Sequence, residues 1–371
     1  SPTEEPKATD HIQEMLDMIS SLIERGKAYE SEGDVFYSVS SFDGYGQLSG
    51  KNIEDLQAGA RVDVNEKKRD ALDFVLWKKS KPDEPNWDSP WGAGRPGWHI
   101  ECSAMGRKYF GDTFDIHGGG KDLVFPHHEN EIAQSCGVTG CLPVRFWVHN
   151  GFVNIDKEKM SKSLGNFFTL RDIYKKFHPE ALRLFLISSH YRSPIDFSMK
   201  NLEDAEKVIL RFYEALDNAE SIVGDHNVSL DEIKNHPFLA KCEKAMNDDF
   251  NTAVVVAHLN EESRGINSEC SLIGNGEGDK KNLALRLSTF KFVGELLGLL
   301  TGSPEKIRQE IFNIKKTELE LDVGKIECLI NDRNEARKNK DWGRADECRE
   351  ELAQMGVVLE DTSKGTEWKI K

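Results

Sequence analysis

One segment near the middle of the chain places the tightest limit on the fold. Thr113–His117 has the composition of a short buried strand, three glycines follow at Gly118–Gly120, and a helix is expected near His127–Ser135. A strand, a glycine turn and a helix in this order are typical of a parallel sheet that binds ligands at its carboxyl edge. The sequence therefore predicts an α/β domain, with further strand over Val144–Val153.

The residues before this segment predict a helix and a strand. Residues 10–25 carry apolar side chains at helical spacing, which indicates an amphipathic helix. Asp10 is its expected N-cap and Gly26 its expected stop. Asp34–Val39 is expected to form a strand.

From about residue 170 the pattern favours helices. Thr169 and Asp172 are spaced as a capping pair, and helices are expected over Glu180–Ser189 and most of 201–300. A charged helical region over 324–353 and a hairpin-like tail complete the chain. Because 371 residues exceed one ordinary core, we expect two or three domains.

Composition excludes some classes of function. The net charge of −15 argues against broad electrostatic binding of nucleic acid, so any such contact needs local basic patches. With no apolar run of about 18 residues, a membrane span is not expected. Seven scattered cysteines, an odd number, indicate a reducing compartment without a disulfide framework, and most are expected to be small core side chains.

Cys102, His127 and Glu131 form the first candidate site. His127 and Glu131 are four residues apart on an expected helix, so they share one face at a spacing suited to a divalent metal. A thiolate, an imidazole and a carboxylate together suit zinc. The alternative is a solvated histidine and glutamate with a packed cysteine, and spacing alone favours that alternative.

Three further features are candidates for binding a phosphate or a small substrate. Lys159-Met160-Ser161-Lys162-Ser163 offers two lysines that can neutralise a polyphosphate, although an exposed basic loop explains it equally well. Gly118–Gly120 lets backbone approach a ligand, or is a plain strand-to-helix turn. Trp98, four residues before Cys102, can wall a small pocket, although a core position is commoner for tryptophan.

Together these segments resemble one family. Lys159–Ser163 resembles the second signature of class I aminoacyl-tRNA synthetases. Gly97–Met105 and Asp115–Glu131 resemble the cysteine-specific members, and Trp342–Lys371 is similar to their C-terminal end. The resemblance covers nearly the whole chain, in order.

The resemblance implies an α/β fold: an incomplete Rossmann-type class I catalytic domain, a helical anticodon-side bundle and a small C-terminal module. It assigns 1–170 to the partial catalytic domain, 171–220 to a stem-contact region, 221–320 to the bundle and 324–371 to a tRNA-recognition module. The family's His-Ile-Gly-His signature and a fourth zinc ligand, a cysteine, have no counterpart. We therefore expect about a hundred residues of the family's fold to precede this chain, and little or no activity from the chain alone.

The resemblance also assigns roles to individual residues. Cys102, His127 and Glu131 are implied zinc ligands, and Trp98 and His117 are implied to line the cysteine site. A further group is implied to bind ATP and the adenylate, with Lys159 and Lys162 as the catalytic residues: Lys159, Met160, Ser161, Lys162, Ser163, Gly118, Gly119 and Gly120.

The implied activity is cysteine–tRNA ligation through a cysteinyl-adenylate, with one Zn²⁺ per subunit and ATP with Mg²⁺. The implied partners are tRNA(Cys) and cysteine, without a membrane, and a cytoplasmic monomer is expected, although an organelle is possible. Two alternatives remain open at this point: a ligase that passes cysteine to an amino-sugar, and a non-catalytic or regulatory synthetase fragment.

Overall fold

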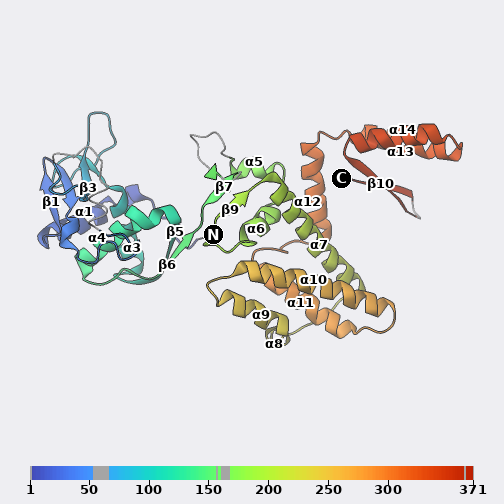
Figure 1. Ribbon diagram of the computed structural model, residues 1–371, viewed down its shortest axis with the longest axis horizontal. Coiled ribbons are helices and arrows are strands. Elements are labelled where there is room, and N and C mark those ends of the chain that lie inside the picture. Colours follow the sequence, from blue (N-terminus) through green and yellow to red (C-terminus); the bar gives the residue numbers. More distant parts are fainter. Residues whose placement is uncertain (1, 53–66, 156–157, 160–167, 363–364, 371) are drawn as a thin grey trace. The chain divides into compact units, whose positions relative to one another are not determined.

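The computed structural model divides into two compact units, Ser1–Phe152 and Val153–Lys371 (Figure 1). No helix among the described residues is long and apolar enough to cross a membrane. The structure describes residues 2–52, 67–155, 158–159, 168–362 and 365–370.

The first unit begins with a helix on a small antiparallel sheet. Helix α1 (Ile12–Glu24) buries five apolar side chains at helical spacing, which confirms the predicted amphipathic helix. Its N-cap is His11 and not the predicted Asp10, because Asp10 ends a separate short turn, Ala8–Asp10, that precedes the helix. The sheet consists of β1 (Ala28–Ser31), β2 (Asp34–Tyr37), β3 (Phe74–Lys79) and β4 (Gly94–Pro96) in that order.

The second part of this unit is the α/β segment that carries the candidate site. Its elements are α3 (Trp98–Phe110), β5 (Phe114–Gly120), a helical turn at Val124–His128, α4 (Glu129–Thr139) and β6 (Val144–Asn150). Strands β5 and β6 are parallel, as the strand–glycine–helix order predicts.

Two expectations about β5 are wrong. The strand is not buried: Ile116 is 55% exposed, because β5 pairs with β6 alone among the described residues. The three glycines are not a turn but the last residues of the strand, since Gly118 pairs with Val148, and Gly120 with Asn150.

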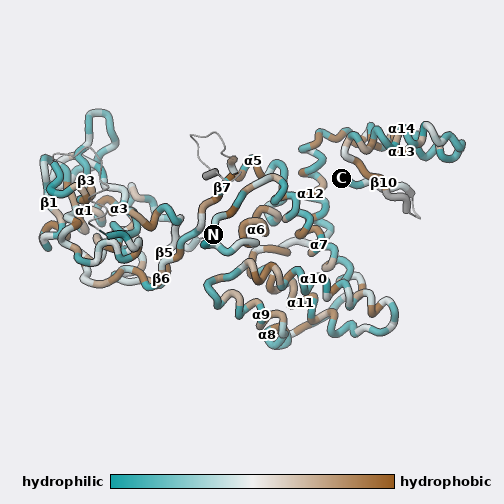
Figure 2. The backbone as a smooth tube through the Cα atoms, viewed as in Figure 1, coloured by the Kyte–Doolittle hydropathy of each residue, from teal (hydrophilic) through white to brown (hydrophobic). Residues whose placement is uncertain are grey.

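The second unit opens with a small sheet and two helices. Strand β7 (Val153–Ile155) lies between β8 (Glu158–Lys159) and β9 (Ile195–Phe197), and α5 (Leu170–Tyr174) and α6 (Pro179–Ile187) separate β8 from β9 in the chain. Thr169 caps α5 by accepting from the Asp172 amide, which confirms the predicted pair. Helix α6 is strongly hydrophobic in Figure 2 and buries much of its length.

A helical bundle follows, as the sequence predicts. Its helices α7, α10 and α11 pack together around one apolar core that α6 shares. The members are α7 (Met199–Val223), α8 (Leu230–Lys234), α9 (Pro237–Met246), α10 (Thr252–Gly274), α11 (Lys280–Leu296) and α12 (Pro304–Glu318).

The C-terminal residues form a module with its own small core. Helices α13 (Val323–Lys338) and α14 (Trp342–Gln354) pack against each other, and β10 (Val357–Thr362) and β11 (Gly365–Ile370) form an antiparallel hairpin. The predicted charged helical region and hairpin tail are therefore confirmed. The bounds of the four predicted regions of the chain remain predictions.

The cysteines differ from expectation in their burial. All seven are free, but only Cys242 and Cys348 are buried. Cys141 and Cys328 are exposed and the other three are half-buried, so most of them are not core side chains.

Candidate metal centre

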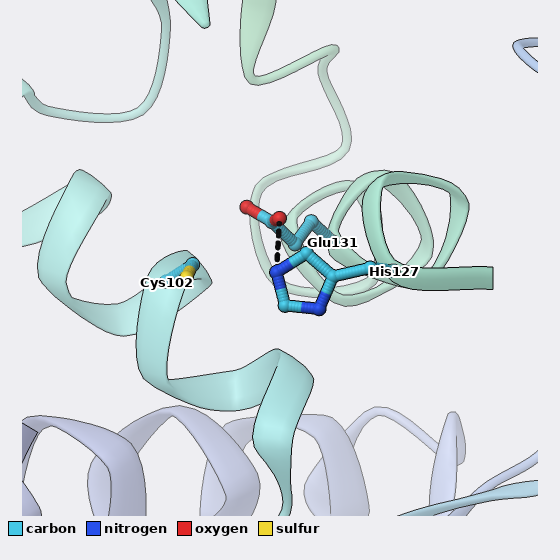
Figure 3. Close-up of side chains that lie close together, drawn as sticks. All are labelled: Cys102, His127 and Glu131. Atoms are coloured by element: carbon cyan, nitrogen blue, oxygen red, sulfur yellow. Dashed lines mark ion pairs between the residues drawn. The ribbon is translucent and has the colours of Figure 1, made fainter. Parts of the chain in front are cut away.

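Three elements bring the predicted zinc ligands together. Cys102 comes from α3, His127 from the helical turn before α4, and Glu131 from the first turn of α4. Figure 3 shows Cys102 on its own helix across from the His127–Glu131 pair. One ligand atom of each residue lies within 4.8 Å of the other two. The fold thus closes the gap of 25 residues that separates Cys102 from His127.

The Glu131 carboxylate is the least satisfied group of this cluster. It is 4% exposed, and its Oε1 lies 3.1 Å from His127 Nε2 without forming a hydrogen bond. A buried carboxylate oxygen without a hydrogen-bond donor is costly, and a bound cation removes that cost. Together with a thiol and an imidazole, this oxygen forms a donor set that fits zinc.

A second group of possible ligands shares Glu131. His117, from β5, and His128 complete a trio whose ligand atoms also lie within 4.8 Å of one another. His117 Nε2 is 3.8 Å from Glu131 Oε2, and His128 Nε2 is 4.0 Å from Oε1. Sequence reasoning did not select His128, although the adjacent pair His127-His128 was a visible signal.

His99 is a further residue that sequence reasoning missed. Its Nδ1 lies 2.8 Å from His127 Nδ1, and burial followed by the neighbouring His127 lowers the pKa of His99 to about 4. A metal bound at His127 Nε2 requires the hydrogen on Nδ1, and neutral His99 can accept that hydrogen. His99 therefore holds the His127 ring in an orientation that suits a ligand.

The protonation of Cys102 depends on its charged neighbours. Burial, with smaller contributions from Glu131 and Glu101, raises the pKa of the Cys102 thiol to about 12. Without a cation the thiol is therefore protonated at neutral pH. A divalent cation among the same groups reverses this preference, because it stabilises the thiolate.

The two residues expected to line the cysteine site flank this cluster. Trp98 is 58% exposed, which excludes the core position, and its ring centroid lies 4.5 Å from that of His127. The His117 ring lies 4.8 Å from the rings of His128 and Trp147. Both residues can therefore contact a small molecule bound at the candidate ligands.

The glycines of β5 differ in their surroundings. A Cβ on Gly119 would lie 2.6 Å from Cε1 of His128, whereas a Cβ on Gly118 would approach nothing closer than the Val148 carbonyl at 3.7 Å. A Cβ on Gly120 would lie 2.4 Å from Oδ1 of Asp122. Gly119 therefore provides the space in which His128 packs.

The expected phosphate-binding segment is described only at its first residue. Lys159 ends β8, opposite Asn154 of β7. Met160, Ser161, Lys162 and Ser163 lie outside the described residues.

Comparison with protein families defines the class of protein. Residues 1–207 match the family described as tRNA synthetases class I (C) catalytic domain, 241–301 match the DALR domain, and 324–368 match the cysteinyl-tRNA ligase anticodon binding domain. Methionyl-tRNA synthetase from Mycobacterium tuberculosis, solved with methionyl-adenylate, has a similar fold, with a TM-score of 0.52. The two sequences are 13% identical, and the match covers 86% of this chain and 77% of that one. The chain therefore carries a class I aminoacyl-tRNA synthetase catalytic domain.

Curated relatives define the particular family. The cysteine–tRNA ligase of Geobacter sulfurreducens is 50% identical over 376 residues, which cover 100% of this chain and 78% of the relative. The cysteine–tRNA ligase of Pelobacter propionicus is 49% identical over 389 residues, with the same coverage. The chain belongs to the cysteine–tRNA ligase family.

Proposed function

We propose that the protein joins cysteine to tRNA(Cys) in two steps, with zinc selecting the amino acid. The cysteine carboxylate attacks the α-phosphate of ATP and releases pyrophosphate, and a hydroxyl of the terminal adenosine of the tRNA then takes the cysteinyl group and releases AMP. The observation that carries the zinc assignment is the convergence of Cys102, His127 and Glu131, together with the buried Glu131 oxygen that has no hydrogen bond.

The chemistry of the donor set explains how cysteine is distinguished from serine. When bound, zinc supplies a Lewis acid that prefers a thiolate to a hydroxyl. Cys102, His127 and Glu131 would hold it at the base of the amino acid site. A purely apolar pocket discriminates poorly between two side chains of such similar size.

The neighbouring residues orient and enclose the bound amino acid. His99 keeps His127 in the ligand tautomer through the contact between their Nδ1 atoms. Trp98 covers His127 from the solvent side, and His117 lies beside Glu131. Their rings exclude water around the amino acid side chain, which strengthens the electrostatic interactions there.

We assign the ATP site by analogy with the family. Lys159 and Lys162 neutralise phosphate charge while pyrophosphate leaves, with Met160, Ser161 and Ser163 in the same segment. The backbone of Gly118–Gly120 approaches the adenylate at the carboxyl end of β5. Mg²⁺ accompanies ATP. The match of residues 1–207 to the class I catalytic domain supports this assignment.

The C-terminal half provides the tRNA contacts. Its matches to the DALR and anticodon binding domains favour tRNA over an amino-sugar as the acceptor. A monomeric, cytoplasmic enzyme remains our prediction.

Metal analysis and cysteine activation test the proposal. We expect the full-length gene product to contain about one zinc per chain and to catalyse ATP–pyrophosphate exchange with cysteine but not with serine. Cys102→Ala should lose both the zinc and the exchange, and Cys328→Ala, at an exposed cysteine of α13, should keep them. Unchanged zinc in Cys102→Ala would refute the ligand assignment, and loss of zinc in His117→Ala alone would point to the second trio.

A further inference from the structure

Two cysteines lie on either side of the C-terminal end of α4. Cys136 is in the last turn of the helix, and Cys141 follows the helix end after Gly140. Gly140 has a φ of +79° and donates its amide to the Cys136 carbonyl at 2.8 Å. This left-handed turn reverses the chain, so that two residues five positions apart come close together.

The Cys136 thiol contacts the backbone of Cys141. Its Sγ donates a hydrogen bond to the Cys141 carbonyl oxygen at 3.2 Å. Cys141 is exposed and Cys136 is half-buried. A disulfide requires such a close approach of the two residues.

The two thiols differ in their surroundings. Cys141 Sγ lies 3.3 Å from Thr139 Oγ1 and 3.6 Å from Thr113 Oγ1, and these hydrogen bonds lower the pKa of Cys141. Burial, followed by the presence of Cys141, raises the pKa of Cys136. Cys141 is thus the more exposed and the more acidic of the two thiols, and Cys136 is the more buried and the less acidic one. This difference suits an attacking thiol beside a resolving thiol.

We propose that Cys136 and Cys141 form a thiol modification site that reacts with hydroperoxides and closes to a reversible disulfide. The Cys141 thiolate attacks the terminal peroxide oxygen and breaks the O–O bond, and Cys141 becomes a sulfenic acid. The other peroxide oxygen takes up the proton that the Cys141 thiol released and leaves as water or an alcohol. The Cys136 sulfur then attacks the Cys141 sulfur, its proton passes to the departing hydroxide, and water is released. The two thiols are oxidised by two electrons and the peroxide is reduced by two.

The position of this site connects it with the candidate metal centre. The turn at Gly140–Pro143 joins α4, which carries Glu131, to β6, which carries Trp147. One cavity is lined by Cys102 and Glu131 and also by Thr139 and Pro143. A disulfide would therefore fix the connection that borders the proposed zinc ligands.

Peptide mapping of the full-length gene product tests the proposal. Trypsin releases one peptide, Asp122–Arg145, that contains Cys136 and Cys141 and no other cysteine. After treatment with hydrogen peroxide we expect this peptide to lose two hydrogens and to resist alkylation, and a thiol reductant should reverse both changes. Cys328, exposed on α13, serves as the internal reference and should still be alkylated at the same dose.

Two variants separate the roles of the thiols. In Cys136→Ser, we expect Cys141 to accumulate as a sulfenic acid that dimedone traps. In Cys141→Ser, Cys136 should remain open to alkylation. The proposal is overturned if wild-type protein keeps both thiols alkylatable at a dose that oxidises Cys328, or if Cys136 is oxidised equally fast in Cys141→Ser.

Discussion

The Nδ1 atoms of His99 and His127 lie 2.8 Å apart, so one of these two nitrogens must carry a hydrogen and the other must accept it. Burial keeps His99 neutral by lowering its pKa to about 4. If His127 donates, its Nε2 is left without a hydrogen and faces Glu131 Oε1 at 3.1 Å. In this tautomer His127 can bind a metal through Nε2, and neutral His99 is the acceptor that the Nδ1 hydrogen requires.

Replacing His99 should weaken zinc binding without removing a ligand. Partners that orient a ligating histidine typically contribute 10- to 100-fold to metal affinity, so we expect His99→Ala to lower zinc affinity by about that factor. Competition with a chromophoric chelator measures the change. His258→Ala is the matched control. Among the described residues, His258 forms an ion pair with Glu261 of the same helix, α10. Equal affinities of His99→Ala and wild type would exclude the orienting role.

The glycines of β5 give a paired prediction within one strand. Gly119→Ala forces His128 to move, because the new Cβ would lie 2.6 Å from its ring. Overpacking of this kind costs about 1–3 kcal/mol of unfolding free energy. Gly118→Ala meets only an ordinary contact at 3.7 Å and should stay close to wild type. Urea unfolding of both variants measures the difference.

The same pair can also be compared in zinc content. Because His128 lies beside Glu131, we expect Gly119→Ala to reduce zinc retention and Gly118→Ala to preserve it. If the two variants behave alike in unfolding and in zinc content, His128 does not depend on the space at Gly119.

The sequence was sufficient to predict the parallel pair β5–β6, helix α1 and the cap of α5 because these depend on local patterns. Periodic apolar residues bury one face of α1, and Thr169 bonds an amide three residues away. The predicted burial of Ile116 was wrong, because burial depends on which elements pack beside β5. The apolar pattern of one strand carries no information about those neighbours.

The residues of the candidate site also divide into those that sequence patterns select and those whose role depends on the folded chain. Ligand chemistry and a helical spacing made Cys102, His127 and Glu131 candidates, but only the family resemblance favoured them over solvated side chains. His99 was missed because a hydrogen bond between two rings 28 residues apart has no spacing signal. The role of Gly119 was likewise hidden, since the space that it provides is defined only by His128 in the folded chain.

A buried carboxylate in the second unit gives a prediction about stability. Glu180, on α6, accepts hydrogen bonds from Tyr213 on α7 at 3.0 Å, from the Leu300 amide at 2.9 Å and from the Thr301 hydroxyl at 2.8 Å. Glutamine has one oxygen in place of two, so Glu180→Gln leaves donors unpaired. We expect a loss of about 2–3 kcal/mol of unfolding free energy.

The control for Glu180→Gln is the residue that follows Tyr213 in the sequence. Glu214 is exposed on α7, and Glu214→Gln should change the unfolding free energy by less than about 0.5 kcal/mol. Tyr213→Phe removes one of the donors to Glu180. Its loss of unfolding free energy should fall between those of Glu180→Gln and Glu214→Gln. A Glu180→Gln protein as stable as Glu214→Gln in urea would show that this hydrogen-bond cluster does not stabilise the unit.

Asp249 gives a prediction about pH. Arg192 donates to it from Nε and a terminal nitrogen, at 2.5 and 3.0 Å, and Tyr191 donates from its hydroxyl at 2.7 Å. The Arg192 hydrogen bonds, followed by that of Tyr191, lower the pKa of Asp249 to about 2. An aspartate in the unfolded chain has a pKa of about 3.9, so the unfolded state takes up the proton first as pH falls.

The stabilising contribution of Asp249 is therefore complete above about pH 5 and is lost progressively as pH falls through the range from about 4 to 2. We expect Asp249→Asn to unfold at a lower urea concentration than wild type at neutral pH, and the gap to narrow by about pH 3. Asp248→Asn, at the adjacent exposed carboxylate, should show no such gap. Because Asp249 is itself exposed, solvent screening keeps its effect small, and the sign of the pH dependence is the decisive observation. A gap between Asp249→Asn and wild type that widens toward low pH would mean that the contact with Arg192 does not depend on the carboxylate charge.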